Sequence, residues 1–374
     1  MSYGTDVAQE AHDLLCTLAR IPAPSHDEGR RAEFVRDWLI GQGLDAEIDD
    51  ALNVTSSYGV GIIGRIALFS AHTDVVFPDT DPLPLVEQDG RIQAPGVGDD
   101  TANLVCLLLA YRELLRRIRT GELKRRRAVM IAANSCEEGL GNLDGMKVLF
   151  ARVGRRIETF VSLDGYAPHV VTRPVGSHRW RISCDTPGGH SYAKFGSPNA
   201  IERLSAFICA FYQLERPDEE PVTVNVGRIE GGTTVNSIAQ HAEALIEYRS
   251  VSEACLATMR ERVEQLVEQS EAEDVRFTLE LIGERPGEGP IDPVRQNALM
   301  KACEQAVVET LGEQVQWGPS STDANVPFSL GIPATTVGAI RGAGAHTREE
   351  WIDVASLAPG VDCALALMER LVCA

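Results

Sequence analysis

The chain has 374 residues, which is long enough for two domains and a large hydrophobic core. Hydrophobic residues make up 44% of it and charged residues 24%, as in ordinary globular proteins. The formal net charge of −19 argues against a nucleic-acid partner, because binding to phosphates requires a basic surface.

Cysteine usage and hydropathy indicate the compartment. The nine cysteines are odd in number and scattered, with no Cys-x-x-Cys pair, so we expect reduced thiols and neither a disulfide framework nor a zinc knuckle. No charged and then apolar leader opens the chain, and no apolar run reaches the roughly 18 residues that a membrane span needs. These features predict a cytoplasmic protein without a membrane partner.

The N-terminal region predicts two helices. Apolar residues at helical spacing favour a helix over residues 6–19, and a Pro-rich tetrapeptide ends it. Ser25 is followed three residues later by Glu28, which predicts a capping box at the start of the second helix. Gly41 marks the expected end of that helix.

Three short apolar runs predict buried strands of a parallel sheet. They cover residues 66–69, 128–133 and 160–163. The polar residues that follow them are, in the same order, His72 and Asp74, then Glu137 and Glu138, then Asp164. Asp99 lies in a Gly-rich loop before a long apolar helix that we expect from about Thr101 to Thr120. Because the carboxyl ends of parallel strands meet at one edge of a sheet, where ligands bind, these side chains are expected to lie together.

The pattern changes at about residue 176. The next segments follow the order strand, helix, strand, strand, helix, strand, which is the β-α-β-β-α-β order of a ferredoxin-like unit. These segments are residues 179–184, 200–214, 222–229, 239–248, 253–268 and 276–282.

The first pattern then returns and leads to a further imidazole. A helix is expected over residues 293–311, a polar loop over 320–325 and a last buried strand over 333–337, which leads through a Gly-rich turn to His346. We therefore predict an α/β protein with a mostly parallel sheet and an inserted α+β domain. Its expected domains are residues 1–175 with 286–374, and the insertion 176–285.

The polar residues at the predicted sheet edge form a donor set without a thiolate. The set comprises His72, Asp99, Glu137, Glu138, Asp164 and His346. Nitrogen and oxygen donors suit zinc or a similar divalent ion, and a shared carboxylate can bridge two ions. Two consecutive glutamates cannot easily bind one ion from the same side, so one ligand and one free base is the simpler division. Each motif alone also fits a structural role: a hydrogen-bonded core histidine, an N-cap at Asp99 or a plain turn after Glu138.

Seven motifs in order carry a family resemblance. They are Ser-Ala-His-Thr-Asp, Gly-Val-Gly-Asp-Asp, Ser-Cys-Glu-Glu-Gly, Leu-Asp-Gly, Gly-Gly-His-Ser, Gly-Gly-Thr-Thr-Val-Asn-Ser-Ile and His-Thr-Arg-Glu-Glu-Trp, within residues 70–351. The sequence thereby resembles the dimeric zinc exopeptidases and deacylases that include peptidase T, carboxypeptidase G, aminoacylase and succinyl-diaminopimelate desuccinylase.

The resemblance implies a role for each matching residue. The expected ligands of two divalent ions per subunit, zinc with cobalt or manganese as alternatives, are His72, Asp99, Glu138, Asp164 and His346. Asp99 would bridge both ions, with a cis peptide bond to Asp100. Asp74 would orient His72. Glu137 would be the general base that takes a proton from the attacking water and later protonates the leaving amine.

The inserted domain would contribute to substrate binding and to a homodimer. His190 would reach the active site of the partner subunit and stabilise the oxyanion, and Asn236 would also contact substrate. Arg249 would hold a substrate carboxylate as a fork. A loop histidine, a turn-forming asparagine and a surface arginine are the structural alternatives for these three.

The resemblance leads to the hypothesis of a metallopeptidase that cleaves small peptides. Asp164 resembles the peptidase T and carboxypeptidase G branches, because the desuccinylase and acetylornithine deacetylase branches more often have Glu there. The nearest alternative is an N-acyl-amino-acid deacylase that uses the same two ions. A metal-binding scaffold without activity is the alternative from another class, and the presence of Glu137 argues against it.

Overall fold

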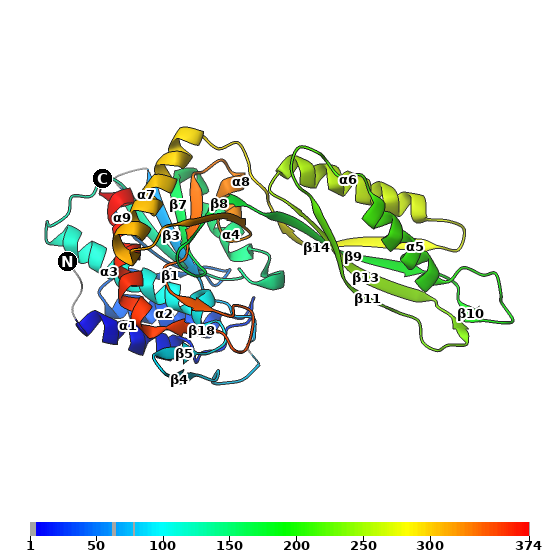
Figure 1. The fold of residues 1–374 in the computed structure, drawn as a ribbon, viewed down its shortest axis with the longest axis horizontal. Coiled ribbons are helices and arrows are strands. Elements are labelled where there is room, and N and C mark those ends of the chain that lie inside the picture. The colour runs from blue at the N-terminus through cyan, green and yellow to red at the C-terminus, as the bar shows by residue number, and fades with distance from the viewer. Residues whose placement is uncertain (1–4, 62–64, 78, 374) are drawn as a thin grey trace. The chain divides into compact units, whose positions relative to one another are not determined.

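The computed structural model describes residues 5–61, 65–77 and 79–373, and the chain divides into two compact units (Figure 1). Unit 1 comprises Met1–Pro174 and Pro290–Ala374, and unit 2 comprises Val175–Gly289. Among the described helices, none is both long and apolar enough to cross a membrane.

Unit 1 is built on an eight-stranded, mostly parallel sheet. Its strands are, in spatial order, β1 (Glu47–Ile48), β2 (Val54–Tyr58), β6 (Ala128–Asn134), β3 (Ile66–His72), β7 (Ile157–Leu163), β16 (Ala334–Val337), β8 (His169–Pro174) and β15 (Gln316–Ser320). The four central strands from β6 to β16 pair in parallel, whereas β1, β2 and β8 are joined to their inner neighbours by antiparallel pairing. The predicted fold class is confirmed, and the antiparallel strands are additions to it.

Helices cover both faces of this sheet because its central strands are apolar on both sides. Ala67 and Phe69 point into a core shared with one helix layer, whereas Ile66 and Leu68 point into the other. The first layer consists of α1 (Thr5–Leu18), α2 (Gly29–Gly41), α3 (Asn103–Arg119), α7 (Pro293–Leu311) and α9 (Leu357–Val372). The second consists of α4 (Asp144–Val153) and α8 (Asn325–Ser329).

A small second sheet of unit 1 was not predicted. Its order is β17 (Gly342–Ala343), β18 (Trp351–Asp353), β5 (Arg91–Gln93) and β4 (Val86–Gln88), with antiparallel pairing throughout. The turn between β17 and β18 contains His346. The sheet therefore anchors a predicted ligand that follows no long strand directly.

Unit 2 has the predicted β-α-β-β-α-β order. Its elements are β9 (Gly176–Asp185), α5 (Ala200–Gln213), β11 (Thr223–Gly231), β13 (His241–Ser250), α6 (Glu253–Ser270) and β14 (Arg276–Arg285), with a short pair β10 (Gly189–His190) and β12 (Ser237–Ile238). The strands form an antiparallel sheet in the order β11-β13-β9-β14. Trp180 and Ile182 face the core with α5 and α6, whereas Arg181 between them pairs with Glu280.

The predicted capping box before α2 is wrong. Glu28 occupies the N-cap position and makes no side-chain cap. The Ser25 hydroxyl instead donates to Asp74 Oδ2 at 2.7 Å, and Glu28 Oε1 accepts the main-chain N–H of Cys136 at 2.9 Å. Both side chains thus bind polar groups that are distant in sequence and follow the ends of β3 and β6, rather than the local helix end.

Candidate metal centre

Six predicted residues lie together at the carboxyl edge of the large sheet. His72 ends β3, Asp164 follows β7, and the two glutamates follow β6. The possible donor atoms form three groups in which all lie within 4.8 Å of one another. The groups are His72 with Asp99 and Asp164, Asp99 with Glu138 and His346, and His72 with Glu137 and Glu138.

Asp99 is shared by two of these groups, and its two oxygens face different imidazoles. Asp99 Oδ1 lies 2.9 Å from His72 Nε2, and Asp99 Oδ2 lies 3.2 Å from His346 Nε2. His346 Nε2 is also 3.2 Å from Glu138 Oε2. A carboxylate placed between two sets of donors is the arrangement by which one side chain can bridge two ions.

The Asp74 carboxylate positions three of the predicted site residues. Its Oδ1 accepts the N–H of Glu137 at 3.0 Å and its Oδ2 accepts the N–H of Glu138 at 2.9 Å. Its Oδ1 also lies 3.3 Å from His72 Nδ1, which leaves Nε2 of that ring directed at Asp99. One buried carboxylate therefore sets the position of an imidazole and of two consecutive glutamates.

Sequence reasoning gave no role to Glu350, which holds the loop that carries Asp99. Glu350 is buried, and its Oε1 accepts the N–H groups of Gly98 at 2.8 Å and Asp99 at 2.7 Å. Its Oε2 accepts the N–H of Gly96 at 2.8 Å. The carboxylate thus gathers three main-chain donors of one loop, as an anion site would.

Asp99 and Asp100, in the same loop, do not serve as the N-cap of the following helix. Helix α3 has Ala102 as its N-cap, with no side-chain cap, and it follows the irregular segment Val97–Ala102, in which Asp99 and Asp100 have non-helical backbone angles. The peptide bond between Asp99 and Asp100 is cis, as the resemblance implied. The Asp100 carboxylate accepts the main-chain N–H of His72 at 2.9 Å, so it joins the loop to the end of β3.

The electrostatics of the site show an excess of buried negative charge. Burial and the neighbouring Asp99 raise the pKa of Asp164 to about 8. Hydrogen bonds that the His346 ring donates to the carboxylates of Asp99 and Glu138 raise the pKa of His346 to about 11. Burial opposes the charged form of His72, but its contacts with Asp74 and Asp99 outweigh this and raise its pKa well above the ordinary value.

The donors fit divalent cations by their chemistry. Glu138 Oε1 is buried and has no hydrogen-bond partner among the described residues. A buried carboxylate oxygen without a partner is costly, and a cation placed among the four carboxylates would satisfy it. Nitrogen and oxygen donors in this mixture suit zinc and related ions.

The three predicted residues of unit 2 do not form one cluster. His190 and Asn236 line the same cavity, and the main-chain oxygen of Asn236 accepts the N–H of Ser191 at 3.0 Å. Arg249 lies near the other end of β13, eight residues beyond His241, which is about 26 Å along a strand. Its guanidinium forms a fork with Glu247, with two distances of 3.0 Å.

Comparison with known proteins gives the class of this chain. Residues 68–370 match the family model of peptidase family M20/M25/M40, which covers most of the chain. The acetylornithine deacetylase of Myxococcus xanthus is 28% identical over 357 residues, with 87% of each chain covered.

Two solved structures share the fold. The aminopeptidase PepT of Bacillus cereus has a TM-score of 0.73 at 20% identity, over 97% of this chain and 98% of that one. YXEP of Bacillus subtilis, a dinuclear metal-binding peptidase, has a TM-score of 0.67 at 15% identity, over 97% and 98%.

The fold and the family match together define a metal-dependent hydrolase. The chain belongs to peptidase family M20/M25/M40. The resemblance inferred from the seven motifs is thereby confirmed, whereas the roles of individual site residues stay predictions.

Proposed function

We propose that the chain hydrolyses the amide bond of small peptides at a centre for two divalent ions. The observation that carries the proposal is the position of Asp99 between two donor groups. His72 and Asp164 would complete the first ion site, and Glu138 and His346 the second. The dinuclear peptidase among the structural neighbours is in accord with this count. Zinc is the proposed ion, with cobalt and manganese as alternatives.

The side chains of the centre would divide the chemistry between them. When bound, the two ions would supply Lewis-acid polarisation of the scissile carbonyl and a lowered pKa for the attacking water. Glu137 would accept the proton of that water and return it to the leaving amine. Asp74 would place this base, because it holds the Glu137 N–H at 3.0 Å.

A substitution of the base tests the mechanism. Glu137→Gln should keep the fold and the bound metal but lose about 10²–10⁴-fold in kcat, the usual contribution of general base catalysis. The matched control is Glu349→Gln, since Glu349 is exposed near the same site. If Glu137→Gln turned over substrate at the wild-type rate, the assigned role would be wrong.

The substrate class is the second part of the proposal. The structural neighbour PepT is an aminopeptidase, and the relative from Myxococcus xanthus is a deacetylase. We propose di- or tripeptides on the basis of Asp164 and the peptidase-like motifs, with N-acyl amino acids as the alternative. A kinetic screen of dipeptides, tripeptides and N-acyl amino acids decides: fast deacylation without peptide turnover would end the peptidase proposal.

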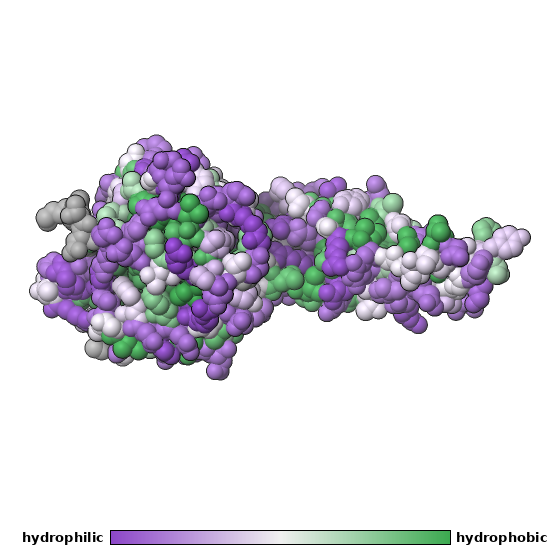
Figure 2. All heavy atoms as spheres, turned by 90° about the horizontal axis from the view of Figure 1, so that it is seen from below, coloured by the Kyte–Doolittle hydropathy of each residue, from purple (hydrophilic) through white to green (hydrophobic). Residues whose placement is uncertain are grey.

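We further propose a homodimer in which unit 2 serves the partner subunit. Unit 2 exposes large apolar side chains, and Figure 2 shows hydrophobic patches among its hydrophilic surface. These residues include Tyr192, Phe195, Ile201, Tyr212, Ile229 and Val235. The cavity that His190 and Asn236 line also includes His241, which is about 26 Å from Arg249 along β13, so one small substrate cannot touch both groups of the same chain. Arg249 would release Glu247 and bind a carboxylate of the substrate in its place.

Complementation tests the proposed exchange between subunits. His190→Ala and Glu137→Gln should each be nearly inactive alone. Mixed dimers formed by co-expression would contain one site with both groups, so about a quarter of all sites should regain activity in a random mixture. If His190 acted within its own chain, no mixed dimer would have a complete site, and activity would not return. A purely monomeric active enzyme in sedimentation would also contradict the proposal.

A further inference from the structure

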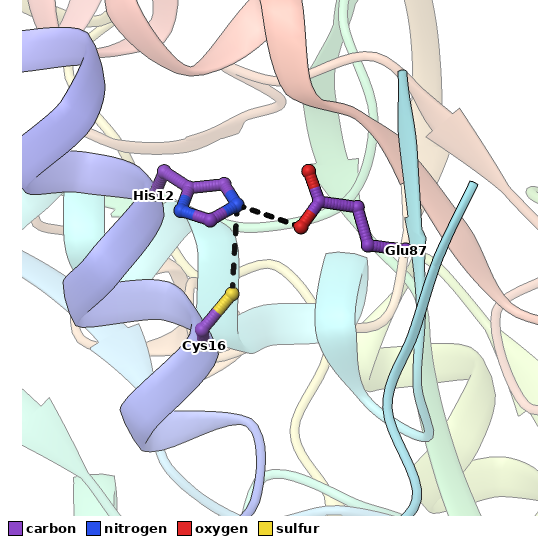
Figure 3. Close-up of side chains that lie close together, drawn as sticks. All are labelled: His12, Cys16 and Glu87. Atoms are coloured by element: carbon purple, nitrogen blue, oxygen red, sulfur yellow. Dashed lines mark hydrogen bonds and ion pairs between the residues drawn. The ribbon is translucent and has the colours of Figure 1, made fainter. Parts of the chain in front are cut away.

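A second cluster of metal-ligating side chains lies in unit 1, on elements that carry none of the predicted ligands of the centre described above. His12 and Cys16 come from α1, and Glu87 comes from β4 (Figure 3). His12 Nε2 is 3.0 Å from Glu87 Oε2 and 3.8 Å from Cys16 Sγ. One donor atom from each of the three residues lies within 4.8 Å of the other two.

The sequence places two of these donors on one face of a helix. His12 and Cys16 are four residues apart in α1, and residues at that spacing lie one above the other. The His12 ring points toward Glu87, and the Cys16 sulfur points toward the same ring nitrogen of His12 (Figure 3). The third donor is 75 residues away in sequence, so the cluster exists only in the folded chain.

Asp13 orients the imidazole of the cluster. Its Oδ1 lies 3.1 Å from His12 Nδ1 and also accepts a hydrogen bond from Gln9 at 2.9 Å. A carboxylate on Nδ1 keeps the proton on that nitrogen, which leaves the lone pair of Nε2 for a ligand. That lone pair is directed at the side where Cys16 and Glu87 lie.

The distances are close to those of a tetrahedral ion site. With metal–nitrogen and metal–oxygen bonds of about 2.0–2.1 Å and a metal–sulfur bond of about 2.3 Å, tetrahedral ligands are about 3.3 Å apart for N and O and about 3.6 Å for N and S. The two observed separations from His12 are 3.0 Å and 3.8 Å, each within a few tenths of an ångström of these values. The donor atoms of Cys16 and Glu87 lie within 4.8 Å of each other, so these two exposed or half-buried side chains would close by about an ångström on binding. The Glu87 side chain is 49% exposed, which leaves an entry path and room for water as the fourth ligand.

We propose that His12, Cys16 and Glu87 bind a further divalent cation of the zinc type, which links α1 to the edge strand β4. Binding would release the Cys16 thiol proton to solvent, so the thiolate and the Glu87 carboxylate together neutralise the ion. The mixed nitrogen, sulfur and oxygen donors favour zinc or cobalt over magnesium or calcium, which prefer oxygen alone. The alternative to a bound cation is a protonated His12, whose imidazolium would form ion pairs with Asp13 and Glu87.

Cobalt is the probe that separates this site from the centre around Asp99. The predicted ligands of that centre include no cysteine, whereas Co²⁺ bound by Cys16 should show a thiolate-to-cobalt charge-transfer band in the near ultraviolet. We expect the full-length protein titrated with Co²⁺ to show this band and Cys16→Ser to lack it. The matched control is Cys209→Ser, because Cys209 is exposed in unit 2 and should leave the band unchanged.

Metal counting gives a second and independent readout. After dialysis against Zn²⁺, the wild type should hold one ion more than Cys16→Ser, whatever number the other centre holds. Asp13→Asn should weaken Co²⁺ binding at this site by roughly 10–100-fold, the usual effect of losing a carboxylate behind a ligating histidine. Glu87→Gln, at an exposed position, should also weaken it without affecting the fold. Equal ion counts in wild type and Cys16→Ser, or a band that survives this substitution, would overturn the proposal in favour of the imidazolium.

Discussion

Glu350→Gln is the substitution that most directly tests how the proposed metal centre is held in place. Glutamine keeps the size of the side chain but replaces one acceptor oxygen by an NH₂ group. Glu350 Oε1 serves the N–H groups of Gly98 and Asp99, and Oε2 serves that of Gly96. Whichever way the amide turns, at least one buried N–H then faces a donor.

The magnitude follows from these contacts. A buried donor without a partner costs about 1–3 kcal/mol, and the remaining hydrogen bonds lose the strength that the charge gave them, so we expect a loss of about 2–4 kcal/mol. Burial raises the pKa of Glu350 to about 7, so the comparison belongs at pH 8, where the wild-type carboxylate is charged. Because the loop carries Asp99, ion affinity should also fall by roughly 10–100-fold.

Two measurements check this prediction at pH 8. Thermal unfolding should show a Tm lowered by about 2–4 °C for each kcal/mol, and competition with a chelator should show the weaker ion binding. Glu349→Gln is the control, because Glu349 is the exposed neighbour of Glu350 and its substitution removes the same charge. If the two variants had the same Tm and the same ion affinity, the hydrogen bonds of Glu350 would not be what fixes the loop.

Three further predictions concern other parts of the chain. Asp74→Asn should lower kcat by at least about tenfold in a steady-state assay, because it weakens the hold on His72 and on the N–H of Glu137. Phe207→Ala should reduce the free energy of unfolding by about 3–5 kcal/mol in urea, since the ring is 2% exposed in the core of unit 2. Burial and the neighbouring Arg260 lower the pKa of His178 to about 4 from 6.5, so the unfolded state binds more protons between these values. Stability should therefore be lost as pH falls from about 6.5 to about 4, and His178→Asn should flatten this dependence in urea titrations.

The main elements of the fold could be predicted where burial is two-sided. The runs at residues 66–69, 128–133 and 160–163 are apolar except for Ser162 and show no alternation, and they form parts of β3, β6 and β7 at the centre of the sheet. The small sheet of β4, β5, β17 and β18 could not be predicted, because strands of two or three residues are too short for a pattern to emerge. Its existence depends on pairing between β5 and β18, which are about 260 residues apart in sequence.

The proposed ligands could be predicted because His72, Glu138 and Asp164 follow strands that sequence pattern defines, and because Asp99 and His346 lie in motifs that carry the family resemblance. Of the residues that position them, Asp74 was implied by the resemblance, whereas Glu350 was given no role. Glu350 and Glu349 are the same amino acid in adjacent positions, yet one is buried against three N–H groups and the other is exposed. Ser25 satisfied a local capping rule, but a tertiary contact with Asp74 took its hydroxyl. Local rules fail here because buried carboxylates bind any available donor more strongly than a helix end does.

The carboxylates of the centre fall into two kinds: some are satisfied by main-chain N–H groups, and others keep negative charge that no donor in the described part of the chain satisfies. Asp74 and Glu350 use their oxygens on main-chain N–H groups, and in this way they fix the backbone of the residues that point inward. Glu138 keeps one buried oxygen without a protein partner among the described residues, and Asp164 has its pKa raised to about 8 by burial and the nearby Asp99. Negative charge that protein donors leave unsatisfied is what a cation can stabilise. A chain that only needed a stable sheet edge would gain nothing from such an arrangement, so the excess charge is itself an argument for ion binding.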